Sequence, residues 1–331
     1  MVGAAVLAVG AAMTGSAGAS VPARPAATTS TAAPAQPSAT TAPARPSATT
    51  SPAQPSATTS PAATYIFWAN YGSGGSGTTI SRADLNGTQV RARFITGADG
   101  PLGVAVHDGY LYWSDPGLYG VCQGSSIGRA TVSGSHVRQG FIGGVTCPQN
   151  IAISGNDLYW ASRDTGNSIG RAQLDGKHVS NNFITQVSSP FGVAVAGGYV
   201  YWADWGTNMD GATIGRAKLN GTDVNDSFIT GASSPTGITV SGPYLYWSNW
   251  ANGTIGRARL NGTDVNESFI TGASGPLGIA VYGSHIYWCN WGSDPGTGHS
   301  IGRANLDGKF AKQRFITGAS APAGITIATV K

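Results

Sequence analysis

The sequence feature that most constrains the fold is a repeat that occurs six times between residue 65 and the end of the 331-residue chain. Each copy contains, in this order, an aromatic–Trp pair, an I-[GS]-R-A motif, a Phe-Ile pair and a Pro. Self-similarity at a fixed period indicates structural units that bury their apolar faces against one another. The aromatic–Trp pairs recur with a mean spacing of 44 residues and end at Trp68, Trp113, Trp160, Trp202, Trp247 and Trp288.

The spacing within the repeat shows which part of it varies in length. From the Ile of each I-[GS]-R-A motif to the Trp of the next repeat the distance is 33 residues in all five cases, whereas from Trp to the following Ile it ranges from 8 to 14. One loop per repeat therefore accepts insertions. The motif also supplies one Arg per repeat. We expect it to bond to a carbonyl or to the Asp or Asn of the strand that carries the aromatic–Trp pair, because an unpaired buried Arg is costly. These structural arginines are Arg82, Arg129, Arg171, Arg216, Arg257 and Arg303.

Each repeat predicts four short strands, which we call strands A to D. In the second repeat they are residues 103–106, 110–114, 127–132 and 137–142. Strands C and D join at an Asn-Gly, Asp-Gly or Ser-Gly pair, and such pairs favour the tight turn of a β-hairpin. Four antiparallel strands per repeat at this period are typical of the blades of a β-propeller.

The two ends of the repeat region complete one another. The first repeat begins directly with its strand B at 65–68, and the chain finishes in a strand A at 322–327 with no strand B after it. We therefore expect the C-terminal strand to close the first blade, which removes the open sheet edges. Residues 65–331 are predicted to be all-β, a six-bladed propeller with four antiparallel strands per blade. The single Glu and the 49 Gly argue against a helical fold.

The motifs resemble a known repeat family. An aromatic–Trp pair followed one position later by Asp or Asn, then I-x-R-A, then L-[DN]-G, is similar to the YWTD (class B) repeats of the low-density lipoprotein receptor family. The chain departs from that pattern at the Asp position, where only Asp115 and Asp204 remain and the third repeat has Ser162. The resemblance covers all six repeats and implies a six-bladed propeller that binds proteins through one face.

The first 64 residues lie outside the repeats. An uncharged apolar stretch, followed by an A-x-A site at 17–19, predicts a signal peptide at residues 1–19 and a secreted or cell-surface protein. The stretch is too short for a transmembrane helix, and none is predicted. Residues 20–64 are almost entirely Pro, Ala, Thr and Ser, a composition that cannot build a core and is typical of a disordered linker.

The charges argue against nucleic acid as a partner. The repeat region holds 17 Lys and Arg and 15 Asp and Glu, and six of these cations are the one Arg per repeat. The pI near 9.0 therefore reflects small numbers, and no basic patch of the kind that binds nucleic acid is predicted. We also expect a monomer.

Binding is expected on the face that carries the B–C and D–A loops, because all the length variation falls there. Three Trp stand three residues after a strand-B Trp, in loops where a core role is hard to assign. Partly exposed aromatic side chains among Asp and Asn suit a sugar or a protein surface, although they could instead cap the neighbouring blade. The candidate ligand-binding residues are Tyr71, Asp115, Tyr119, Asp204, Trp205, Asp210, Trp250, Trp291 and Asp294, with Arg163 and Asp164 in the same loops.

Three Cys in an exported chain predict one disulfide and one free thiol. Cys122 and Cys147 both fall in loops of this face, so we expect them to pair. Cys289 follows a strand-B Trp and is expected to be a buried, small hydrophobic side chain. The five His lie at unrelated repeat positions without metal-ligand spacing, so no catalytic residue, metal or cofactor is predicted.

Three functions stay open at this point. The first is an exported binding module for a protein or a polysaccharide, acting through the face with the B–C and D–A loops. The second is a metal-dependent propeller enzyme, a lactone hydrolase or lyase, whose acidic groups would need shifted pKa values near the axis. The third is a structural cell-surface protein.

Overall fold

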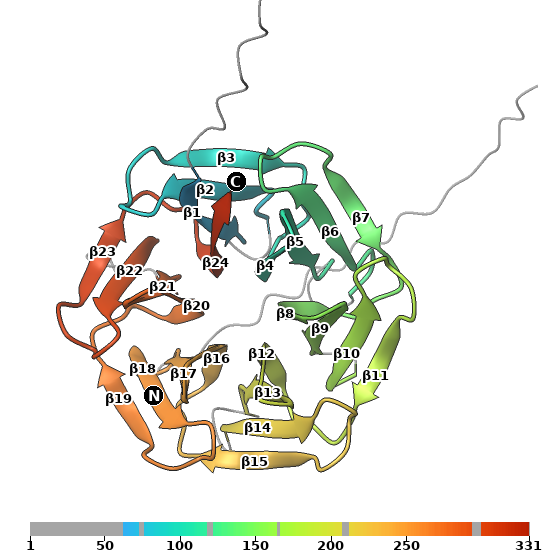
Figure 1. The fold of residues 1–331 in the computed structure, drawn as a ribbon, viewed down its shortest axis with the longest axis vertical. Coiled ribbons are helices and arrows are strands. Elements are labelled where there is room, and N and C mark those ends of the chain that lie inside the picture. Colours follow the sequence, from blue (N-terminus) through green and yellow to red (C-terminus); the bar gives the residue numbers. More distant parts are fainter. Residues whose placement is uncertain are drawn as a thin grey trace, which may run out of the picture. The chain divides into compact units, whose positions relative to one another are not determined.

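The computed structural model describes residues 62–72, 76–117, 122–163, 166–206, 212–292 and 299–330. Within these ranges the regular structure is β-strand, and no described segment forms a helix with the length and hydropathy of a membrane span. Twenty-four strands form six four-stranded sheets, which stand around a central axis like the blades of a wheel (Figure 1). The six-bladed propeller predicted from the repeat is confirmed.

In every blade, strand A is nearest the axis and strand D is on the outer wall (Figure 1). From blade 1 to blade 6, strand A is β24 (Pro322–Val330), β4 (Val104–His107), β8 (Pro148–Ser154), β12 (Pro190–Ala196), β16 (Pro235–Ser241) and β20 (Pro276–Tyr282). Strand B is β1 (Ala63–Asn70), β5 (Tyr110–Asp115), β9 (Asp157–Ser162), β13 (Tyr199–Asp204), β17 (Tyr244–Asn249) and β21 (His285–Asn290). Strand C is β2 (Thr79–Asp84), β6 (Ser126–Thr131), β10 (Ser168–Gln173), β14 (Thr213–Lys218), β18 (Thr254–Arg259) and β22 (Ser300–Asn305). Strand D is β3 (Arg91–Thr96), β7 (Arg138–Ile142), β11 (Ser180–Ile184), β15 (Asn225–Thr230), β19 (Asn266–Ile270) and β23 (Lys312–Ile316).

The ring closes through the C-terminal strand, as predicted. β24 pairs antiparallel with β1 in the sheet order β24-β1-β2-β3, with Ile327 opposite Ile66. β1 begins at Ala63, two residues before the expected start, because Ala63 pairs with Val330 and extends the ladder.

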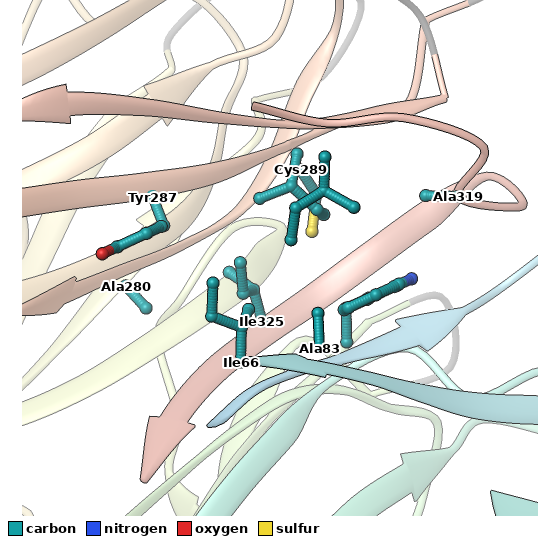
Figure 2. Packing of buried hydrophobic residues seen from close by; sticks show 10 residues of the cluster. Ile66, Ala83, Ala280, Tyr287, Cys289, Ala319 and Ile325 are labelled. Atoms are coloured by element: carbon teal, nitrogen blue, oxygen red, sulfur yellow. The ribbon is translucent and has the colours of Figure 1, made fainter. Parts of the chain in front are cut away.

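The core lies between neighbouring blades. Figure 2 shows this packing between blades 6 and 1, where Ile66 and Ile325 of blade 1 lie near Tyr287 and Cys289 of blade 6. Cys289 is free and fully buried, as predicted, and burial raises the pKa of its thiol. A buried, protonated thiol packs as a small apolar group.

The strand-B Trp side chains are core residues in all six blades, each at most 1% exposed. Each of the five strand-C glycines of the I-G-R-A motifs makes room for one of them. At Gly128, for example, an added Cβ would lie 2.1 Å from the Trp113 ring. The repeated Gly is therefore a packing requirement of the repeated Trp.

The six repeat arginines make a repeated contact within their own blades, and their partners are aromatic rings. Each guanidinium lies over the ring of the strand-D Phe of its own blade, 3.7 to 4.6 Å from the ring centroid. In Arg82, Arg129, Arg216 and Arg257 the guanidinium also faces a strand-B Tyr. The partners that the structure gives these cations are thus aromatic faces, rather than the carbonyl or strand-B Asp or Asn expected from the sequence.

Candidate binding site

The last residue of strand B fastens the D–A loop that leads from the preceding blade into its own. Asp115 accepts hydrogen bonds from the Trp113 indole Nε1 at 3.0 Å and from the backbone N of Asp99 at 3.2 Å. Asp204 and Asn290 likewise accept from a backbone N sixteen residues earlier in the chain, at 3.0 Å in both cases. The Asp and Asn of the repeat therefore hold the face on which binding was predicted.

A second contact fixes the aromatic residues that follow. Three residues after the strand-B Trp, the backbone N donates to the carbonyl that precedes the repeat Pro. Trp205, Trp250 and Trp291 make this bond at 3.0, 3.2 and 3.2 Å, and Tyr71 makes it at 3.2 Å. Four aromatic side chains are thus anchored by their backbones at one end of the propeller.

These side chains surround a cavity of about 250 Å³. All six blades contribute to its lining, so the cavity lies on the propeller axis. The lining residues are Tyr71, Leu102, Gln149, Arg163, Phe191, Trp205, Trp250, Leu277 and Trp291.

One side of the cavity is an aromatic wall. The ring centroids of Phe191 and Trp205 are 5.8 Å apart and those of Trp205 and Trp250 are 5.2 Å apart, with interplanar angles of 38° in both pairs. Tyr71 and Trp291 pack with a small apolar cluster that includes Leu102 and Leu277 of the same lining. The aromatic side chains are half-buried, which leaves part of each ring open to a ligand.

The other side is polar and comes from blade 3. The Arg163 guanidinium lies 5.2 Å from the Trp205 ring centroid and 5.9 Å from that of Phe191. The Gln149 amide Nε2 donates to the Cys147 carbonyl at 3.3 Å, and its side chain is buried. The cavity therefore offers aromatic faces together with one cation and one amide.

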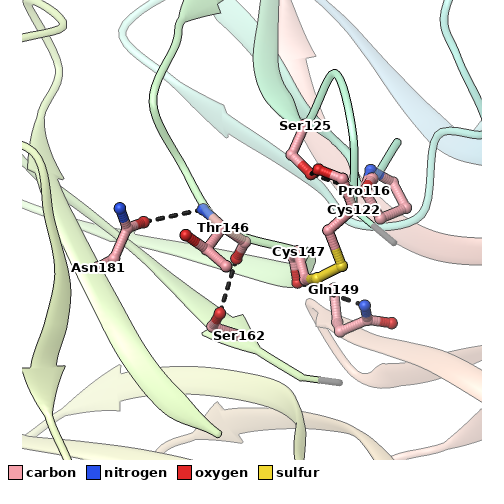
Figure 3. The surroundings of a disulfide bond; sticks show 8 residues. All are labelled: Pro116, Cys122, Ser125, Thr146, Cys147, Gln149, Ser162 and Asn181. Carbon is pink, nitrogen blue, oxygen red and sulfur yellow. Dashed lines mark hydrogen bonds between the residues drawn. A yellow bond between two sulfur atoms is a disulfide. The ribbon is translucent and has the colours of Figure 1, made fainter. Parts of the chain in front are cut away.

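The predicted disulfide between Cys122 and Cys147 is confirmed, and it supports this polar side (Figure 3). The two Cα atoms are 5.0 Å apart and the bond spans 25 residues. The loop before Gln149 is fastened further at Thr146, whose backbone N donates a hydrogen bond to the Asn181 Oδ1 at 2.8 Å. The Ser162 hydroxyl donates to the Thr146 carbonyl at 2.7 Å.

Of the predicted ligand-binding residues, the structure brings Tyr71, Trp205, Trp250 and Trp291 together in the cavity. Asp115 and Asp204 are 2% and 0% exposed and do not line it, because their carboxylates fasten backbone groups instead. Burial raises the pKa of Asp115 to about 7 and also raises the pKa of Asp204. Tyr119, Asp164, Asp210 and Asp294 lie outside the described residues.

Sequence reasoning missed the residue that follows the repeat Pro. Leu102, Gln149, Phe191 and Leu277 occupy this position and line the cavity. The signal was present as a variable residue between a fixed Pro and, in five blades, a fixed Gly. Only the convergence of six strands on one axis brings these positions together.

Beyond the cavity, the strands A line a central channel of about 280 Å³ with Ala, Val and Ile side chains and a few polar ones such as Asn150 and Thr239. Neighbouring strands come very close where they begin, and a Cβ added to Gly278 would lie 2.3 Å from the Ala323 carbonyl oxygen. Within the described ranges, no group of three His, Cys, Asp or Glu is placed to hold a metal ion. The chemistry that the described residues support best is recognition by aromatic contact.

Comparison with known proteins agrees with this architecture. The family model for the low-density lipoprotein receptor repeat class B matches residues 198–240 and 244–282. No curated protein sequence matches the chain. A chain of a nidogen/laminin complex superimposes with a TM-score of 0.64 at 22% identity, over 80% of this chain and 98% of that one.

A second similar structure is an enzyme. Catalytically inactive virginiamycin B lyase from Staphylococcus aureus, solved with quinupristin, superimposes with a TM-score of 0.53 at 20% identity, over 77% of this chain and 86% of that one. Identities this low establish a shared fold. The ring of six blades identifies the chain as a six-bladed β-propeller, and two stretches of it, residues 198–240 and 244–282, are similar to low-density lipoprotein receptor class B (YWTD) repeats.

Proposed function

We propose that this protein is an exported binding module that recognises a protein or a polysaccharide through the propeller face bearing the B–C and D–A loops. The observation that carries the proposal is the on-axis cavity with its four anchored aromatic residues, Tyr71, Trp205, Trp250 and Trp291. Half-buried aromatic side chains on a rigid scaffold supply a large contact area with little loss of conformational entropy on binding.

The size of the cavity limits what enters it. Pockets for drug-sized ligands occupy roughly 300 to 1,000 Å³. A cavity of about 250 Å³ suits a single group, such as one sugar ring or one anchoring side chain of a protein, while the rest of the partner contacts the surrounding loops. The group would place its apolar face on the Trp rings and a hydrogen-bond acceptor toward Arg163 and Gln149.

Two findings support export and a protein partner. A disulfide persists in oxidising compartments, and receptor class B repeats and nidogen are extracellular types of domain. The similar chain belongs to a nidogen/laminin complex, which favours a protein partner for this propeller. The signal peptide proposed for residues 1–19 would deliver the chain to that compartment.

The test uses the full chain as bait on culture medium and cell-wall extracts, compared with the triple variant Trp205→Ala, Trp250→Ala, Trp291→Ala. We expect a partner or glycan that the wild type retains and the triple variant loses. The matched control is Phe310→Ala, which removes an aromatic side chain that is 78% exposed and outside the cavity lining. Equal retention by the triple variant would contradict the proposal.

The metal-dependent enzyme is the second candidate, since a propeller lyase shares the fold. The proposed acidic groups at the channel mouth do not favour it, because Asp115 and Asp204 are buried and already accept backbone hydrogen bonds. Metal analysis of the purified full chain, with lactone and uronide substrates assayed before and after chelation, decides between the two. Turnover that chelation abolishes would establish the enzyme, and a bait with neither partner nor turnover would favour a structural cell-surface protein.

A further inference from the structure

The outward-facing positions of strand D carry charge in one half of the ring only. Strand D is the outermost strand, and its first and third residues at the outer edge point away from the core in every blade. From blade 1 to blade 6 these two positions hold Arg91 and Arg93, Arg138 and Gly140, Ser180 and Asn182, Asn225 and Ser227, Asn266 and Ser268, and Lys312 and Arg314.

All five cations fall in blades 6, 1 and 2, which are consecutive in the ring (Figure 1). The three outer strands are also tied together. The Gln139 Nε2 of β7 donates to the Thr96 carbonyl at the end of β3 at 2.8 Å, and the Phe315 ring of β23 packs against Gly87 of blade 1. We call the five residues Arg91, Arg93, Arg138, Lys312 and Arg314 the basic wall.

The charge of the rest of the molecule follows the same division. Residues 148–276, which form blades 3 to 5, hold seven Lys and Arg and nine Asp and Glu. The rest of the propeller, residues 65–147 and 277–331, holds ten Lys and Arg and six Asp and Glu. The expectation that the positive charge is not clustered is therefore wrong, because folding gathers cations from both ends of the sequence into three neighbouring blades.

The basic wall differs in its ion pairing from other exposed cations of the propeller. In blades 4 and 5 the exposed cations Lys218 and Arg259 form ion pairs with Asp223 and Asp264. Among the described residues, no acidic side chain forms an ion pair with any member of the basic wall. Edge-strand protection does not account for the cations either, since the outer strands of blades 3 to 5 expose the same kind of edge with Asn and Ser.

We infer that the basic wall binds an anionic polysaccharide. The three strands occupy successive sectors of a six-fold ring, so their outer faces turn by about one sixth of a circle from blade to blade (Figure 1). An extended, flexible polyanion can follow such a curved wall and contact all five cations. A flat bilayer meets only one blade at a time. Duplex DNA, with a persistence length of about 150 base pairs, follows the wall only at a cost in bending free energy that a flexible chain avoids. Proteins that bind single-stranded nucleic acid combine cations with aromatic side chains on which the bases stack, and these strand positions carry no aromatic side chain.

The test measures binding of the full chain to polygalacturonate at low salt, with neutral dextran, anionic phosphatidylglycerol vesicles and single-stranded DNA as comparison probes. The variant Arg91→Asn, Arg93→Ser gives blade 1 the side chains of blade 5 and leaves the fold intact. We expect polygalacturonate affinity to fall about tenfold in this variant and to decrease with salt in the wild type, because charge pairing is screened.

The matched control is Lys218→Asn, Arg259→Asn, which removes the same charge from the opposite half and should bind like the wild type. The triple cavity variant Trp205→Ala, Trp250→Ala, Trp291→Ala should also keep polygalacturonate binding, so that failure of the cavity proposal and failure of this one are distinguishable. Equal losses in the two charge variants, binding to dextran as strong as to polygalacturonate, or a preference for vesicles or DNA would each overturn the inference.

Discussion

Two sectors of the ring use the same repeat position in different ways. Three residues after the strand-B Trp, blades 4, 5, 6 and 1 carry Trp205, Trp250, Trp291 and Tyr71, which form the aromatic side of the cavity. Blades 2 and 3 carry Pro116 and Arg163 instead, and only these two blades are joined by a disulfide. One sector therefore offers contact area, and the other offers a cation held on a covalently fastened loop.

The comparison shows how a repeat protein makes an asymmetric site. The buried Trp, the strand-C Gly and the Arg stacked on Phe recur because every blade must pack on the next in the same way. The loop positions share a backbone hydrogen bond, but their side chains escape that requirement because they end at the cavity. Variation confined to these positions places a polar group opposite an aromatic wall without altering the blades.

The largest expected effect concerns the residue that fastens the loop in blade 2. In the folded protein burial raises the pKa of Asp115 from 3.8 to about 7, so the folded state binds the proton more tightly than the unfolded state does. This contribution to the free energy of unfolding is fully present below about pH 4 and is lost as the pH rises through 7. The loss amounts to up to about 4 kcal/mol. Asp115→Asn should remove this loss and be more stable than the wild type at pH 8, as measured by urea unfolding.

The same chain offers a precedent for that substitution. Asn290 already occupies the equivalent place in blade 6, where its Oδ1 accepts from the Ser274 backbone and its Nδ2 donates to the Gln313 carbonyl. If the stability of Asp115→Asn fell between pH 4 and 7 as steeply as that of the wild type, another group would have to carry the effect.

The second prediction concerns the covalent fastening of blades 2 and 3. Cys122→Ser, Cys147→Ser should lower the free energy of unfolding by about 3 to 4 kcal/mol, because a bond across 25 residues restricts the unfolded chain. Dithiothreitol should destabilise the wild type by a similar amount and leave the double variant unchanged. A wild type indifferent to the reductant would show that packing alone holds the loop.

The third prediction separates the two sides of the cavity. Once a partner is known, Trp250→Ala should weaken binding by about 2 kcal/mol, roughly thirtyfold, since it removes a central aromatic contact. Arg163→Lys keeps the charge but loses the planar guanidinium above Trp205, and should weaken acidic partners more than neutral ones. Titration calorimetry measures both, and equal effects on every partner would remove the distinction between an aromatic and a polar side.

The smallest prediction compares two core Trp residues. The Trp113 indole donates to Asp115, whereas the Trp160 indole has no hydrogen-bond partner among the described residues, because Ser162 stands at the Asp position. Trp→Phe should therefore lower the free energy of unfolding by about 1 kcal/mol more at Trp113 than at Trp160, because one hydrogen bond contributes about that much. Chemical denaturation of the two variants gives the difference, and equal costs would show that packing dominates at both positions.

The fold could be predicted almost completely from the sequence, and the site only in part. A fixed spacing of 33 residues and a repeated hairpin turn determine the number of blades, their strands and the closing strand. The same loop reasoning found Tyr71, Trp205, Trp250 and Trp291. It also selected Asp115 and Asp204, because an acidic residue next to a loop is equally compatible with solvent and with a buried hydrogen bond until its neighbours are known.

What the sequence determined by itself is everything that repeats, since periodic packing requires the same residue types in every unit. What only the tertiary structure decided is which non-repeating residues meet. Gln149 and Leu277 stand in different blades and share a cavity, and Arg91 and Lys312 lie near opposite ends of the propeller sequence on one outer wall. Closure of the ring through β24 brings the first and last blades together, and no local pattern records such a contact between distant segments.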